Sequence, residues 1–108
     1  MQSSETDAEL TQRLNGETAK IEWHQLQKHY ASGNVLLINQ DYDLIKVAMA
    51  MHRDDTEQIK QWLEKSVVAE VSDSQAQSWY EKDIIVWALV IPPFVLVQEV
   101  NSTNKPIN

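Results

Sequence analysis

Apolar residues follow two periods along this 108-residue chain, one typical of helices and one typical of strands. Spacings of three and four residues predict helices near 6–21, 22–33, 54–65 and 72–83. Alternating or continuous apolar runs predict strands over 34–39, 44–51, 67–71, 84–91 and 94–100. This order predicts an α+β fold with about four short helices on a mainly antiparallel sheet of four to five strands.

The predicted helix ends carry capping signals. Side chains suited to a capping box occur at Thr6 and Glu9, Asp54 and Glu57, and Ser72 and Gln75. Gly16 is expected to bend or stop the first helix, since glycine costs about 1 kcal/mol relative to alanine inside a helix. Gly33 stands where the second helix needs a C-terminal cap. In the last helix, Ala76, Trp79 and Tyr80 are expected to face inward.

The segment LIKVAMAMH, residues 44–52, fits both periods. A strand would place alternate residues, from Ile45 to Met51, on one side, whereas a helix would form a stripe from Leu44, Val47, Ala48 and Met51. The alternation includes every residue, so a strand is favoured, although alanine and methionine prefer helices.

The most apolar stretch is IIVWALVIPPFVLVQEV, residues 84–100. Both sides of its first strand are apolar, which predicts a strand in the middle of the sheet with cover on both faces. Pro92 and Pro93 cannot adopt the backbone angles of the tightest hairpin turns, so a wider loop is expected to follow.

Composition excludes several classes of function. The formal net charge of −7, with scattered basic residues, argues against binding to DNA or RNA. The chain has no cysteine for a disulfide, a thiolate metal site or a thiol nucleophile. Its apolar run is too short and too interrupted to span a membrane, and its acidic start does not resemble a secretory signal. We expect one cytoplasmic domain over 1–108, with its core in 6–100 and a disordered tail at 101–108.

Three phrases of the sequence are similar to an uncharacterised bacterial family, domain of unknown function 2288. They are LNGETAKIEWHQLQKHYASGNVL, DLIKVAMAMHRDD followed by WL, and VIPPFVLVQ, and together they span about residues 10–99. One departure is Glu22, where the family often has proline. The resemblance implies a small bacterial cytoplasmic protein, and it implies no reaction and no catalytic residue.

Metal and cofactor chemistry have little support in the spacing of polar residues. His24 and His29 would point about 140° apart on a helix, so they cannot share a metal ion. A more acidic group comprises Asp41 and Asp43 on one side of the 44–51 segment, and His52, Asp54 and Asp55 on the other. If that segment is a strand, the two sets lie about 25 Å apart. We therefore expect no metal, no cofactor and no catalytic residue.

Two functions remain as hypotheses. The first is a non-catalytic binding or assembly module, a homodimer joined through an apolar sheet surface that includes Trp87, Leu89 and Phe94. The alternative is a small-molecule-binding protein or enzyme with a pocket near Tyr42, Asp43, His52 and Trp87. Core packing is the better interpretation of the other tryptophans, Trp23, Trp62 and Trp79, because each predicted helix places its tryptophan on the apolar face.

Overall fold

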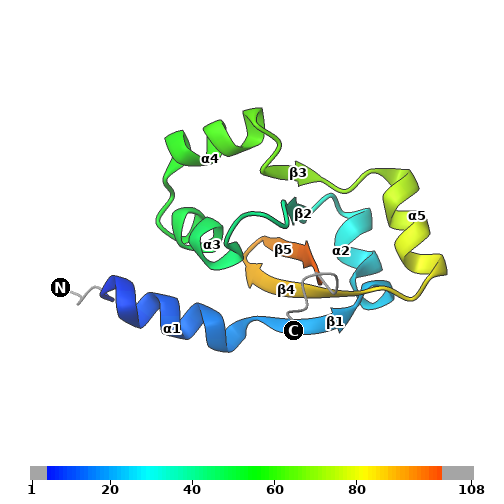
Figure 1. The fold of residues 1–108 in the computed structure, drawn as a ribbon, viewed down its shortest axis with the longest axis horizontal. Helices are drawn as coiled ribbons and strands as arrows, with labels where there is room; N and C mark the ends of the chain where they lie inside the picture. Colours follow the sequence, from blue (N-terminus) through cyan, green and yellow to red (C-terminus); the bar gives the residue numbers. More distant parts are fainter. Residues whose placement is uncertain (1–4, 101–108) are drawn as a thin grey trace.

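A computed structural model describes residues 5–100 of the chain, so the predicted tail at 101–108 lies outside the described residues. Figure 1 shows a sheet with helices grouped on both of its sides. The helices are α1 (Asp7–Glu17), the 3-10 turn η1 (Trp23–Leu26), α2 (Gln27–Ala31), α3 (Leu44–His52), α4 (Thr56–Glu64) and α5 (Asp73–Glu81). The strands are β1 (Ala19–Glu22), β2 (Val35–Ile38), β3 (Val68–Glu70), β4 (Ile85–Ile91) and β5 (Phe94–Glu99).

The sheet has five strands in the order β1-β4-β5-β2-β3. Three of its four strand pairs are antiparallel, and β2 runs parallel to β5. The predicted α+β class and the mainly antiparallel sheet are therefore confirmed. The strand predicted for residues 84–91 is also confirmed in the middle of the sheet, since β4 lies between β1 and β5.

Two hydrophobic cores lie on opposite faces of this sheet, because successive residues of a strand point to opposite sides. The first core packs α1, α3 and α4 onto one face and takes Leu89, Ile91 and Leu96 from the strands. The second core packs η1 and α5 onto the other face and takes Val86, Val95 and Val97. Adjacent residues of β5 thus belong to different cores.

The expected strand at 44–51 is wrong, because this segment is the helix α3. The helix buries Leu44, Val47 and Ala48, which is the helical stripe rather than the alternating one. Asp43 caps its start by accepting a hydrogen bond from the Ile45 backbone N–H at 2.9 Å. Helix-favouring alanines and methionines, together with this cap, outweigh the alternation.

The first two helices are shorter than the apolar spacing predicts. The first ends at Glu17, which confirms the expected stop near Gly16, and residues 19–22 form the strand β1, which pairs with β4. The second begins as the turn η1 and continues as the five-residue α2. The sequence of β1, AKIE, has one large apolar residue, so its extended form depends on pairing with β4 rather than on its own pattern.

Four helices end in the same way, with a residue in the left-handed conformation after the cap. These residues are Gly33, Asp54, Ser66 and Asp83, with φ of 77°, 59°, 62° and 54°. In each case the next residue donates its N–H back to the helix, as Asn34 does to the His29 carbonyl at 3.0 Å. Asp54 is therefore part of a helix end, and the predicted capping role belongs to Asp55, which accepts from the Gln58 N–H.

The structure also bears on the expected burial of Tyr80 and on the expected absence of a membrane span. Tyr80 was expected to face inward with Trp79 and Ala76, but it is 55% exposed while the other two are buried. Within residues 5–100, no helix is long and apolar enough to cross a membrane.

Candidate functional site

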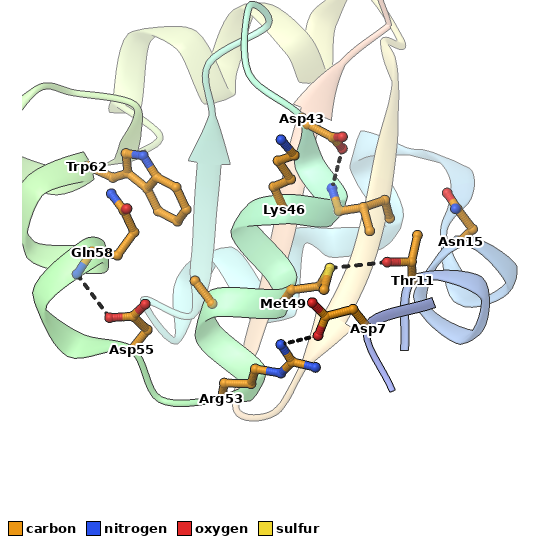
Figure 2. A pocket seen from close by; sticks show the side chains of 12 residues that line it. Asp7, Thr11, Asn15, Asp43, Lys46, Met49, Arg53, Asp55, Gln58 and Trp62 are labelled. Atoms are coloured by element: carbon orange, nitrogen blue, oxygen red, sulfur yellow. Dashed lines mark hydrogen bonds and ion pairs between the residues drawn. The ribbon is translucent and has the colours of Figure 1, made fainter. Parts of the chain in front are cut away.

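A groove lies on the outer surface of the helical layer formed by α1, α3 and α4. Its volume is about 580 Å³, and α3 forms its floor between the other two helices. Figure 2 shows Asp7, Thr11 and Asn15 of α1 on one side and Asp55, Gln58 and Trp62 of α4 on the other. The floor residues come from α3: Ile45, Lys46, Met49, Ala50 and Arg53. We call this site the α3 groove.

The groove follows from the two-sided character of α3. One side of the helix enters the first core, and the side turned away from the sheet carries Ile45, Met49 and Ala50, which are only partly buried. The small Ala50 side chain leaves space on the floor. Met49 contacts α1, because the Thr11 hydroxyl donates to its Sδ at 3.3 Å. Trp62 of α4 packs against the first core while part of its ring stays exposed, so it forms an aromatic wall.

Most charged side chains of the α3 groove already have partners. Asp43 and Asp55 accept hydrogen bonds from the first turns of α3 and α4, where the helix dipole favours a negative charge. Arg53 forms an ion pair with Asp7. Lys46 makes no ion pair with any residue of the described range 5–100. The ammonium group of Lys46 is therefore the charge in the groove that remains available to a ligand.

The acidic residues on the two sides of α3 are closer together than predicted. A nine-residue helix rises only about 13 Å, whereas the expected strand would have separated them by about 25 Å. As a result Asp43 and Asp55 line the same groove. The strand on which the predicted separation rested is wrong, and one residue of each set, Asp43 and Asp55, lines this groove. Among residues 5–100, no three His, Asp or Glu side chains are grouped closely enough to hold a metal ion.

Three of the four residues in the predicted pocket do meet. Tyr42, Asp43 and Trp87 line a shallow depression of about 250 Å³, together with Gln98. The Gln98 amide holds the loop there by donating to the Tyr42 carbonyl at 2.7 Å. His52 is exposed at the far end of α3 and lines neither this depression nor the α3 groove.

The residues predicted for an interface are largely covered by the helices. Leu89 is 1% exposed within the first core, so it cannot contact a partner of the folded chain. Trp87 and Phe94 are partly buried against the same core. The Lys20 ammonium lies 5.1 Å from the centre of the Trp87 ring, where cation–π attraction favours it.

The side chains whose pKa departs from its ordinary value, Glu5, Arg13 and Tyr30, lie outside the α3 groove. The hydrogen bond that Tyr30 donates to the Asp73 carboxylate raises the pKa of Tyr30, because losing the proton would also lose this bond. The hydrogen bond from Arg13 lowers the pKa of Glu5, since it stabilises the charged carboxylate. Both pairs are exposed: the first joins α2 to α5, and the second joins the residue before the cap of α1 to that helix.

The family model described as "Protein of unknown function (DUF2288)" matches residues 9–99. The chain belongs to this family. A solved relative has the same fold: the NMR solution structure of PA1075 from Pseudomonas aeruginosa is 33% identical, with a TM-score of 0.77. The match covers 99% of this chain and 98% of that chain. No curated protein matches the chain.

Sequence reasoning did not find the α3 groove. Its lining comes from three helices, and one of them was interpreted as a strand. The signal was present in LIKVAMAMHR, because a helical interpretation puts Ile45, Met49 and Ala50 on a second apolar surface beside the core stripe. That surface is wider than one buried face requires.

Proposed function

We propose that this protein is a non-catalytic binding module whose α3 groove holds a metabolite-sized ligand with an apolar or aromatic body and an anionic group. The observation that carries the proposal is the groove itself. Its volume of about 580 Å³ falls within the range of roughly 300 to 1,000 Å³ found for small-molecule sites. A bacterial, cytoplasmic setting, expected from the family resemblance, belongs to the same proposal.

The lining suggests the chemistry of the ligand. Ile45, Met49 and Ala50 offer an apolar floor, and the Trp62 ring offers a surface on which a flat group can stack. Methionine adapts its shape to different ligands because its side chain is flexible and polarisable. The ammonium group of Lys46, which forms no ion pair with a residue of 5–100, then favours a carboxylate, sulfonate or phosphate on the ligand.

A binding role suits these residues better than catalysis. A general acid or base must direct its carboxyl or imidazole group toward the substrate. In the α3 groove, Asp43 and Asp55 direct theirs to helix N-termini, and Asp7 pairs with Arg53. These groups organise the site and hold its helices in place.

The dye 1-anilinonaphthalene-8-sulfonate tests this proposal, because it combines aromatic rings with one anionic group. We expect its fluorescence to rise on binding to the native protein. Lys46→Glu should weaken the affinity about fivefold, since an exposed charge contact contributes up to about 1 kcal/mol. Ala50→Trp should abolish binding by filling the floor. The matched control is Lys60→Glu, which makes the same charge change on the exposed side of α4.

Circular dichroism verifies that each variant remains folded. Equal affinities for wild type, Lys46→Glu and Ala50→Trp would place the dye elsewhere and contradict the proposal. An equal loss of dye affinity in Lys46→Glu and Lys60→Glu would show that net charge, rather than the groove, controls binding.

A second candidate function is self-assembly, and a different surface supports it. Ile85 is 47% exposed and lies two residues before the partly buried Trp87 on the same side of β4. Tyr42 is 44% exposed and lines the shallow depression together with Trp87. Exposed apolar residues gathered in this way are typical of interfaces. Sedimentation from micromolar to millimolar concentration tests this candidate: a rising mass supports assembly, and a constant monomer mass contradicts it.

A further inference from the structure

The strand β1 leaves one edge of the sheet open. It pairs with β4 on one side and stands at one end of the strand order, so no described strand covers its other side. The Trp23 N–H donates to the Ile84 carbonyl at 2.9 Å, which fixes the alternation of the ladder. Ala19, Ile21 and Trp23 therefore direct their backbone groups toward β4, and Lys20 and Glu22 direct theirs outward.

The side chains of this open edge have a self-complementary order. Lys20 and Glu22 are exposed on one face of the sheet, and Ile21 lies between them on the other face, packed against the second core. We propose that β1 pairs antiparallel with β1 of a second copy, around a two-fold axis at Ile21. Each Lys20 then lies opposite Glu22 of the other copy, and the two Ile21 side chains meet.

The charges of Lys20 and Glu22 favour this alignment of the two strands over alignments whose two-fold axis lies one residue away. An axis at Lys20 would place the two Lys20 side chains opposite each other, and an axis at Glu22 would do the same with the two Glu22 side chains. Like charges directly opposite each other destabilise a strand pair, whereas opposite charges stabilise it. Charged residues often protect an edge strand from pairing, and here they disfavour the other two registers while permitting one.

The pairing would create one continuous sheet of ten strands from two copies. Four outward backbone groups of Lys20 and Glu22 in each copy would gain partners, giving four hydrogen bonds between the strands. With only four residues in each strand, the interface is small, so we expect a weak dimer that forms reversibly with concentration.

This inference rests on the proposed assembly function and is independent of the α3 groove. The proposed contact between copies lies at the edge strand β1, which adjoins the apolar surface around Trp87. Lys20 links the two regions, since its ammonium already lies over the Trp87 ring.

Sedimentation equilibrium on charge variants of the full chain tests the pairing. Lys20→Glu and Glu22→Lys should each weaken self-association about tenfold, because each places two pairs of like charges opposite one another. An equal mixture of these two variants should regain wild-type affinity, since every opposed pair is again Lys with Glu. The double variant carrying both changes should also regain it.

Glu22→Pro, compared with Glu22→Gln, which removes the same charge and keeps the backbone N–H, tests the backbone contacts separately. The φ of Glu22 is −70°, which proline accepts, and its N–H points away from β4, so the monomer should keep its stability. Dimer affinity should fall because two of the four hydrogen bonds lose their donor.

The outcomes separate the inference from the function on which it rests. A wild-type protein that stays monomeric at millimolar concentration overturns both. A dimer that is unaffected by Lys20→Glu, Glu22→Lys and Glu22→Pro keeps the assembly function and overturns the pairing of β1. If each single charge variant associates more weakly and their equal mixture regains wild-type affinity, the pairing of β1 is supported. If the mixture does not regain affinity, the pairing is overturned.

Discussion

The two faces of the sheet differ in how completely their aromatic residues are enclosed. On the face of η1 and α5, Trp23 is fully buried and meets Trp79 and Tyr30 edge-on, with ring centres 5.0 and 5.6 Å apart. Its indole N–H donates to the Ala76 carbonyl at 3.0 Å. On the face of α1, α3 and α4, Trp62 and Met49 remain partly exposed along a groove.

This difference assigns the enclosed aromatic residues to stability and the partly exposed ones to binding. The ring of Trp23 finds all its contacts within the chain, so its contribution is to hold the short turn η1 and α5 onto the sheet. The ring of Trp62 finds only part of its contacts there, and the remaining surface is available to another molecule. The helices α1, α3 and α4 are longer than η1 and α2, so they make a stable layer even with the groove between them.

The largest expected effect is that of Trp23→Ala. Removing a fully buried aromatic ring costs about 3 to 5 kcal/mol and here also leaves the Ala76 carbonyl without its donor. Urea unfolding followed by circular dichroism measures the loss. A loss below about 1 kcal/mol would show that the second core tolerates the cavity and would weaken the comparison.

Trp62→Ala should have a smaller effect on stability and a larger one on binding. Part of the ring is already exposed, so we expect a loss of about 1 to 2 kcal/mol, together with loss of anilinonaphthalene sulfonate binding. Tyr80→Ala is the control, since it removes an exposed aromatic ring from α5 on the other face. If both variants bind the dye as wild type does, Trp62 is not a binding residue.

The smallest effect concerns pH and the ion pair that joins Glu5 to α1. The pKa of Glu5 is lowered in the folded chain from its ordinary value of 4.5, so the pair stabilises the fold above that pH. This contribution disappears as the pH falls through the folded pKa. The melting temperature of wild type should exceed that of Glu5→Gln slightly at pH 7, and the gap should narrow as the pH falls below 4.5 and through the lowered pKa of Glu5. A gap independent of pH would assign the effect to packing.

Local signals made the helix ends and the central strand predictable. The capping pair of Thr6 and Glu9 depends on residues three apart, and both of its hydrogen bonds form in the structure. The strand β4 was predictable because its two apolar sides require a middle position.

Features that depend on distant residues were not predictable in this way. The strand β1 is extended because it pairs with β4, whose residues come much later in the chain. Ile21, for example, lies opposite Val86, which is 65 residues further on. The segment 44–52 satisfied both periods, and the Asp43 cap, the helix-favouring alanines and methionines, and packing between α1 and α4 together select the helix. The α3 groove combines side chains from three helices, so no single stretch contains its pattern.

The position of β5 has a consequence for how the chain folds as it is made. This strand joins the β1–β4 ladder to the β2–β3 ladder, and its residues enter both cores. Among the described strands it is also the last to be synthesised, and each core needs residues from it. We therefore expect both helical layers to close onto the sheet together once β5 is present, and a disruptive change in β5 to destabilise both layers.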